Sequence, residues 1–248
     1  MSRASTRDYE SMPLSWCTEE EFVEYFYEPE DEWHCIHEVL DGFLFQGNVT
    51  ASMSEKVYRH HNLSGIVNVT SSMARPAHVE DPEQHYLQIE VLDCDSHASS
   101  LAERLDEACE FIGTDLLCYS QLLWPALHFG LHHGVGSILR LTFEAAHKER
   151  DERVLVHCAA GVSRSSTVSL SYLVAKEGMS LREAWFLLSS KRKIAEPNSG
   201  FWEALINFEK EKRGEATVTM QKGEYGWLEP DVYFQTPDQG TADAGPCD

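Results

Sequence analysis

The sequence contains the stretch VLVHCAAGVSRS at residues 154–165. Residues 153–157 predict a short apolar strand, and a helix is expected to follow from Ser165. A tight loop between a strand end and a helix N-terminus points several backbone N–H groups at one spot. Together with the helix dipole, these groups bind a dianion such as phosphate. Gly161 lets the loop turn without a steric clash from a side chain. The stretch therefore predicts a phosphate-binding loop.

Two side chains of this stretch suggest chemistry beyond binding. Arg164 offers a planar guanidinium that can hold two phosphate oxygens. Cys158 is expected at the mouth of the positive loop, where the thiolate form of its side chain is favoured. A thiolate that faces a bound phosphoryl group is a nucleophile for covalent catalysis. The alternative interpretation of Cys158 is a buried structural cysteine.

The stretch resembles the HCxxGxxRS motif of the cysteine-dependent protein phosphatases. The wider resemblance is to the dual-specificity phosphatases, and most of all to catalytic domains of the MAP-kinase-phosphatase type, over about residues 36–210. The other matching blocks are GFLFQG at 42–47, IVNVT at 66–70, YLQIEVLD at 86–93, SYLV at 171–174 and RKIAEPNSGF at 192–201. This resemblance implies an α/β fold with a central, mostly parallel (mixed) sheet flanked by helices on both faces. The alternation of predicted strands and helices favours the same class.

The resemblance also implies catalytic roles for individual residues. Cys158 would attack phosphorus and form a phosphocysteine. Asp93 would protonate the leaving oxygen and then activate water for the second step. Asp95 is a rival candidate for that acid. Ser165 would donate a hydrogen bond to the departing thiolate.

The remaining site residues would bind the phosphate or support the loop. His157 and Asn198 would support it, and neither a metal nor another cofactor is implied. The phosphate oxygens would be held by Arg164 and by the backbone amides of Ala159, Ala160, Gly161, Val162, Ser163 and Arg164.

Charge and composition restrict the substrate and the location. The chain carries 20 Lys and Arg against 41 Asp and Glu, a net charge of −21, and the loop side chains are small and uncharged. Phosphoinositides, RNA, other nucleic acid and anionic membranes are therefore poor partners. A phosphoprotein substrate is expected, with phosphotyrosine and phosphoserine or phosphothreonine accepted in a shallow pocket, and a kinase is a candidate partner. Seven cysteines without a CxxC pair favour a reducing compartment. The expected location is the cytoplasm, with the nucleus as a second candidate.

The chain divides into three predicted parts. Residues 1–35 form an acidic N-terminal arm, residues 36–213 the catalytic domain, and residues 214–248 a disordered C-terminal tail. Within the domain, local patterns predict two strands around an Asp-Gly turn at 39–45, a weak helix at 51–60, strands at 65–69 and 86–91, helices opened by capping boxes at Ser100 and Ser180, and a last helix from Pro197 to about Arg213.

Residues 113–142 form an unusual segment inside the predicted domain. They contain one acidic residue, Asp115, and one basic residue, Arg140. Removing them shortens the separation of Asp93 and Cys158 from 65 to 35 residues, which is the usual range of the family. The segment therefore reads as an insertion, either from an alternative exon or as a lid or partner surface. An alternative function follows, a phosphatase-like isoform with impaired turnover that binds phosphoproteins. A thiol enzyme of the rhodanese or arsenate-reductase type is disfavoured by the blocks at 86–93 and 198–201.

Overall fold

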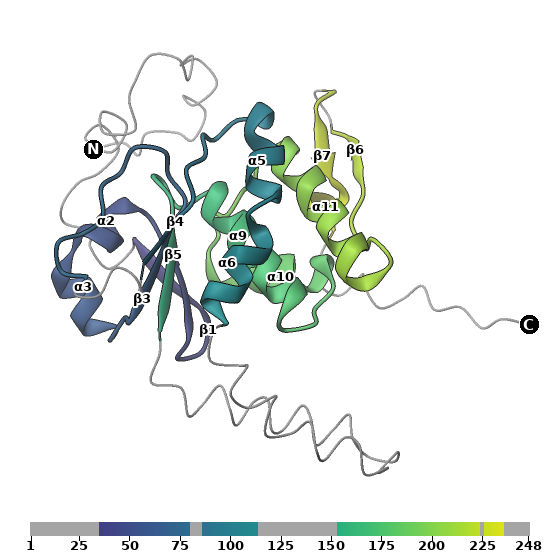
Figure 1. Ribbon diagram of the computed structural model, residues 1–248. Coiled ribbons are helices and arrows are strands. Elements are labelled where there is room, and N and C mark those ends of the chain that lie inside the picture. Colours follow the sequence, from purple (N-terminus) through teal and green to yellow (C-terminus); the bar gives the residue numbers. More distant parts are fainter. Residues whose placement is uncertain (1–34, 80–85, 114–152, 224–225, 236–248) are drawn as a thin grey trace, which may run out of the picture.

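The computed structural model describes residues 35–79, 86–113, 153–223 and 226–235 (Figure 1). The predicted arm at 1–35 and the insertion at 113–142 lie outside the described residues, apart from Cys35 and Gly113. The centre is a five-stranded sheet with the order β1-β2-β5-β3-β4. The strands are β1 (Ile36–Leu40), β2 (Leu44–Gly47), β3 (Gly65–Asn68), β4 (Tyr86–Gln88) and β5 (Val154–His157). Within this sheet only the β1–β2 pair is antiparallel, so the predicted mixed, mostly parallel sheet is confirmed.

Helices cover both faces of this sheet, as predicted. Because side chains alternate along β5, Val154 and Val156 enter the larger core while Leu155 enters the smaller one. Helices α2 (Val49–Met53) and α3 (Glu55–His60) cover the smaller core. The larger core is covered by α5 (Ala98–Ala102), which follows the short turn η3 (Asp95–His97), and by α6 (Leu105–Ile112), α9 (Arg164–Ala175), α10 (Leu181–Lys191) and α11 (Ser199–Arg213). In the described part of the chain, no helix combines the length and apolar character needed to cross a membrane.

The predicted helix starts have different outcomes. The capping box at Ser180 is present, with Ser180 and Glu183 bonded reciprocally at the start of α10. The predicted start at Ser100 is wrong, because α5 already begins at Ala98. The cause is the preceding turn η3, where Asp95 accepts a hydrogen bond from the Gly200 amide at 3.1 Å and thereby fixes the chain before Ser100 is reached.

The prediction of a disordered tail at 214–248 is wrong for residues 214–223 and 226–235, here called the C-terminal hairpin. Strand β6 (Met220–Lys222) pairs antiparallel with β7 (Leu228–Pro230), and the turn η4 (Asp231–Phe234) follows. Val218 and Val232 are buried in the larger core. Tyr233 packs against Trp185 and Trp202, with ring centroids 5.1 and 5.8 Å away. Burial of these apolar side chains supplies the stability that composition alone did not predict.

Two polar side chains anchor the hairpin to the helices. Arg182 of α10 donates from Nε to the carbonyl of Thr217 at 3.0 Å and pairs with Asp231 at 2.7 Å. Glu209 of α11 is fully buried and accepts from the amides of Leu181 and Thr217, both at 2.7 Å. Figure 1 accordingly shows β6 and β7 lying against α11.

Candidate active site

The predicted phosphate loop connects the end of β5 to the start of α9. Strand β5 ends at His157 and α9 begins at Arg164, so residues 158–163 form the loop. Its parallel neighbours β2 and β3 run in register with β5 up to His157, which places the loop at the carboxyl edge of the sheet. This edge is where open α/β sheets commonly bind ligands.

Cys158 lies at the base of this loop, and the prediction that it lies at the mouth is wrong. Its side chain is only 1 % exposed. The Sγ atom accepts a hydrogen bond from the Gly161 amide at 3.2 Å and lies 3.4 Å from Ser165 Oγ. Both neighbours can stabilise a negative charge on sulfur, because both can donate to it. The structure therefore places Ser165 beside the sulfur, and the donation from Ser165 to the departing thiolate stays a prediction.

Gly161 is needed for the shape of the loop. Its φ is +71°, a backbone conformation that side-chain-bearing residues rarely adopt. A Cβ atom built at this position would lie 2.5 Å from the carbonyl oxygen of Gly47, at the end of the neighbouring strand β2. No other residue therefore fits at this point of the loop.

The loop carbonyls are bonded from outside the loop. This is the arrangement expected when the amides of a loop face a ligand, because carbonyl and amide point in opposite directions within each peptide group. The bonds run from Val49 N to Ala159 O at 3.1 Å, from Arg192 Nε and Gln46 Nε2 to Gly161 O at 2.7 and 3.3 Å, and from Glu196 N to Val162 O at 2.9 Å.

The structure brings Asp93 and Arg164 together beside the loop. Arg164 is buried, donates from Nη1 to the carbonyl of Val91 at 3.1 Å, and places Nε 3.5 Å from Asp93 Oδ2. The other carboxylate oxygen of Asp93 accepts from Ser163 Oγ at 2.7 Å and from Asn198 Nδ2 at 2.9 Å. Asn198 also caps α11 through its side-chain oxygen, so a helix terminus holds the amide that contacts Asp93.

Asp95, the rival candidate, is held at a different place. Its Oδ1 accepts from the Gly200 amide at 3.1 Å, and Ser199 Oγ lies 3.1 Å from its Oδ2. These contacts tie Asp95 to the first turn of α11. The described contacts with Ser163 and Arg164 thus belong to Asp93.

His157 is neutral under the loop at physiological pH. Complete burial is the main cause that lowers the pKa of its imidazole to about 4, and the nearby charge of Arg164 lowers it further. Its Nδ1 lies 3.3 Å from the carbonyl oxygen of Cys158. This position fits a side chain that supports the loop and does not contact phosphate.

Sequence reasoning missed two polar side chains behind the loop. Gln46 is buried at the end of β2 and donates to Ser166 Oγ at 2.8 Å as well as to the Gly161 carbonyl. Arg192 is also fully buried, although it follows directly after α10. Both lie in blocks that match the family, and a polar residue inside such a block was the available signal. Among the described residues, no cluster of three or more His, Cys, Asp or Glu side chains could hold a metal ion.

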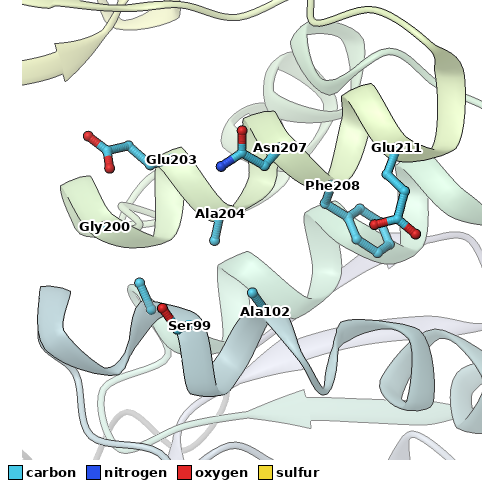
Figure 2. Close-up of a pocket in the computed structure, with 9 residues that line it drawn as sticks. Ser99, Ala102, Gly200, Glu203, Ala204, Asn207, Phe208 and Glu211 are labelled. Atoms are coloured by element: carbon cyan, nitrogen blue, oxygen red, sulfur yellow. The ribbon is translucent and has the colours of Figure 1, made fainter.

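A surface groove lies between α5 and α11, apart from the phosphate loop. Figure 2 shows small residues of both helices facing each other across it, with Glu203 and Glu211 on the α11 side. Its volume is about 260 Å³, and none of residues 157–165 lines it. The groove is therefore not the site at which the predicted chemistry would occur.

Comparisons with known proteins point to the dual-specificity phosphatases. A family model described as "Dual specificity phosphatase, catalytic domain" matches residues 141–211. Dual specificity protein phosphatase 14 of Bos taurus is 28 % identical over 190 residues, which cover 73 % of this chain and 87 % of that protein. Dual specificity protein phosphatase Mpk3 of Drosophila melanogaster is 30 % identical over 176 residues, covering 71 % of this chain and 34 % of that protein.

Solved structures show the same fold. A structure named "mouse putative dual specificity phosphatase complexed with zinc tungstate" superposes with a TM-score of 0.53 at 24 % identity, covering 76 % of this chain and 95 % of that one. The crystal structure of DUSP15 gives a TM-score of 0.52 at 22 % identity, covering 72 % of this chain and 90 % of that one.

Proposed function

Because this chain belongs to the dual-specificity phosphatase family, we propose that it removes phosphate from phosphotyrosine and from phosphoserine or phosphothreonine of protein substrates. The observation that carries the proposal is the environment of Cys158 Sγ. The atom lies at the base of a phosphate-binding loop, 3.2 Å from a donating amide and 3.4 Å from a hydroxyl. Thiolate attack on a phosphoryl group requires this combination of anion-binding loop and stabilised sulfur.

In the first step, the loop amides and the Arg164 guanidinium bind the phosphate oxygens of the substrate. The Cys158 thiolate attacks phosphorus and the bond from phosphorus to the leaving oxygen breaks. Asp93 in its acid form gives its proton to that oxygen, and a phosphocysteine remains. The contacts of Asp93 with Ser163 and Asn198 support this role, because they hold its carboxyl group beside Arg164.

In the second step, the Asp93 carboxylate takes a proton from water, and the water oxygen attacks phosphorus. The bond between sulfur and phosphorus breaks and inorganic phosphate leaves. Ser165 donates a hydrogen bond to the thiolate that is released, a role supported by its 3.4 Å distance from Sγ. A developing negative charge is stabilised best by a donor that is already in place.

The substrate and the location are further parts of this proposal. Phosphoproteins fit the small, uncharged side chains of the loop and the net charge of −21. A phosphorylated kinase is the candidate partner. The cytoplasm, and the nucleus as the second candidate, fit the reduced thiols of Cys94, Cys109 and Cys158.

Nothing in the described part of the chain favours the alternative of a binding module with impaired turnover. Cys158, Arg164, Asp93 and Ser165 are all present, and the described contacts join them around one loop. We propose that residues 113–142 are an insertion into an otherwise complete domain. The position of the family match, which starts at residue 141, supports this proposal.

The decisive experiment measures hydrolysis of a fluorescent aryl phosphate at about pH 6–7. The intact chain, Cys158→Ser and a chain lacking residues 113–142 are compared, with vanadate as inhibitor. We expect turnover by the intact chain that falls about 10³-fold or more in Cys158→Ser. Peptides with phosphotyrosine and with phosphothreonine then test both specificities. Lack of turnover in the intact chain would overturn the proposal, and activity only after deletion would favour the impaired isoform.

A further inference from the structure

We propose that Arg192 is a positioning residue of the phosphate loop, and this inference rests on the proposed function. Its guanidinium holds the peptide groups of Ala160 and Gly161 in the orientation in which the loop amides can bind phosphate oxygens. Arg192 itself lies behind the loop and does not touch the reacting atoms.

The contacts of Arg192 reach two consecutive peptide groups of the loop. Its Nε donates to the carbonyl of Gly161 at 2.7 Å, and its Nη2 donates to the carbonyl of Ala160 at 3.4 Å. The third nitrogen, Nη1, lies 2.7 Å from Nδ1 of His37 on β1. The side chain is completely buried. One rigid planar group therefore links the loop to the edge strand of the sheet.

The loop needs such a donor because its carbonyls face the protein interior. An unpaired buried carbonyl is costly, and its peptide group would rotate to find another partner. The Gly161 carbonyl also accepts from Gln46 at 3.3 Å, but this bond does not reach the Ala160 carbonyl, to which Arg192 donates. Rotation of the peptides that follow Ala160 and Gly161 would turn the amides of Gly161 and Val162 away from the ligand. The Gly161 amide is the one that donates to Cys158 Sγ. Arg192 thus acts on the nucleophile through the backbone.

The fit between Arg192 and the loop is close. A Cβ atom at Gly161 would lie 2.5 Å from Nη2, so the guanidinium packs directly against this glycine. Lysine cannot replace these contacts, because a single ammonium cannot present several donors in a fixed plane. These contacts therefore require an arginine at position 192 and a glycine at position 161.

Backbone hydrogen bonds fix the main-chain position from which the Arg192 side chain extends. The amide of Arg192 donates to the carbonyl of Leu188 at 2.7 Å at the end of α10, and its carbonyl accepts from the Ala195 amide at 3.0 Å. The same segment, residues 192–198, delivers Asn198 to Asp93 at 2.9 Å. One segment therefore supports both the phosphate loop and the proposed acid.

A matched control exists in Arg182, which binds the backbone elsewhere. It donates to the carbonyl of Thr217 in the C-terminal hairpin and has no described contact with the phosphate loop. Loss of Arg182 should therefore lower stability without changing the loop. This pair separates a positioning role from a general contribution to folding.

The experiment compares Arg192→Lys, Arg192→Met and Arg182→Met with the intact chain. Thermal unfolding, orthovanadate binding by titration calorimetry, and kcat and KM for an aryl phosphate are measured well below the unfolding temperature. For Arg192→Met we expect kcat/KM and vanadate affinity to fall about 100-fold, the scale of a misplaced catalytic group. Arg192→Lys should lose about 10-fold, since its ammonium can still donate but not to both carbonyls from one fixed plane. Arg182→Met should unfold at a lower temperature yet stay within about twofold in both other measurements.

The proposal is overturned if folded Arg192→Lys and Arg192→Met bind vanadate and turn over within twofold of the intact chain. If Arg192→Met does not fold, Arg192→Lys decides the question by the same criterion. Vanadate binding also separates the two proposals. An intact chain that binds vanadate without turnover contradicts the proposed function, while the binding of the variants still tests Arg192.

Discussion

The phosphate loop and the C-terminal hairpin are each held by an arginine that donates to main-chain carbonyls, but the two regions differ in what the bonds achieve. Around the loop, Arg192 binds two consecutive carbonyls from behind and the opposite side of the backbone stays available for an anion. At the hairpin, Arg182 binds Thr217 and Asp231 and draws a late segment onto the helices, where Val218 becomes fully buried.

Similar hydrogen bonds from an arginine to the main chain therefore have different consequences in the two regions. Bonds at the loop orient peptide groups for a ligand, so their loss should mainly lower turnover. Hydrogen bonds at the hairpin hold it against the larger core, so their loss should mainly lower the free energy of unfolding. Four predictions test this separation, beginning with the largest expected effect.

The first prediction concerns the two aspartates of the same segment. Asp93→Asn should lower kcat about 10²- to 10³-fold for a phosphotyrosine peptide, because the leaving oxygen loses its acid. Folding should be preserved, since an asparagine oxygen can still accept from Ser163 and Asn198. Steady-state kinetics and thermal unfolding check both statements.

The matched control is Asp95→Asn, which alters the contacts with Ser199 and Gly200 instead. It should keep kcat within about threefold and change stability by less than about 0.5 kcal/mol, because Asp95 is exposed and an asparagine oxygen can still accept from the Gly200 amide. A larger kinetic loss in Asp95→Asn than in Asp93→Asn would assign the acid to Asp95.

The second prediction concerns the hairpin. Glu209→Leu should lower the free energy of unfolding by about 3 kcal/mol, because the amides of Leu181 and Thr217 lose a buried acceptor. Urea unfolding measures this loss, and kcat/KM at 25 °C should stay within about twofold. Glu203→Leu, on the exposed side of the same helix (Figure 2), is the control and should change stability by less than about 0.5 kcal/mol. A parallel loss of turnover in Glu209→Leu would break the proposed separation.

The third prediction concerns His157, where a loop residue should affect stability through pH. Burial lowers the pKa of His157 from 6.5 to about 4. Between pH 4 and pH 6.5, the imidazole is therefore protonated in the unfolded chain and neutral in the folded chain. The contribution is complete above pH 6.5 and is lost as pH falls toward 4. It should amount to about 2 kcal/mol between pH 7 and pH 5. Urea unfolding of the intact chain and of His157→Gln measures it, and identical pH dependence in both would contradict the role of burial.

The fourth prediction has the smallest expected effect. Ser165→Ala removes the hydroxyl that lies 3.4 Å from Cys158 Sγ and should slow release of the thiolate about 10-fold. Because formation of the phosphocysteine is less affected, a burst of aryl alcohol should precede the steady state in rapid-mixing experiments. Absence of a burst, with kcat unchanged, would remove Ser165 from the second step.

The comparison also explains how far the sequence could predict this molecule. The loop with Cys158, Gly161 and Arg164 is contiguous, so strand, turn and helix signals overlap in twelve residues and one pattern describes them all. Asp93 was identified because it ends a block that matches the family. Where local signals decide the structure, as at Ser180, the prediction is confirmed.

The predictions are wrong where contacts between residues far apart in the sequence determine the local structure. Ser100 carries a good capping pattern, but η3 is held by Gly200, about a hundred residues away, and the helix starts earlier. The hairpin has weak periodicity and depends on Arg182 and Glu209 for its position. In the sequence, nothing distinguishes Arg192 from the basic residues next to it. Its position behind the phosphate loop follows only from the folded structure. No local pattern contains these pairings.

The strand order has a consequence for how the chain is made. Strand β5 lies between β2 and β3 in the sheet, yet it leaves the ribosome after all four other strands of that sheet. Until residue 157 has been synthesised, the antiparallel pair β1–β2 and the parallel pair β3–β4 have no common neighbour, and each exposes an open edge toward the missing strand. Long-range parallel pairing of this kind forms slowly. The strand that ends beside the proposed nucleophile Cys158 is thus also the one that unites the sheet, and a nascent chain cannot hold an assembled site before this strand has been added.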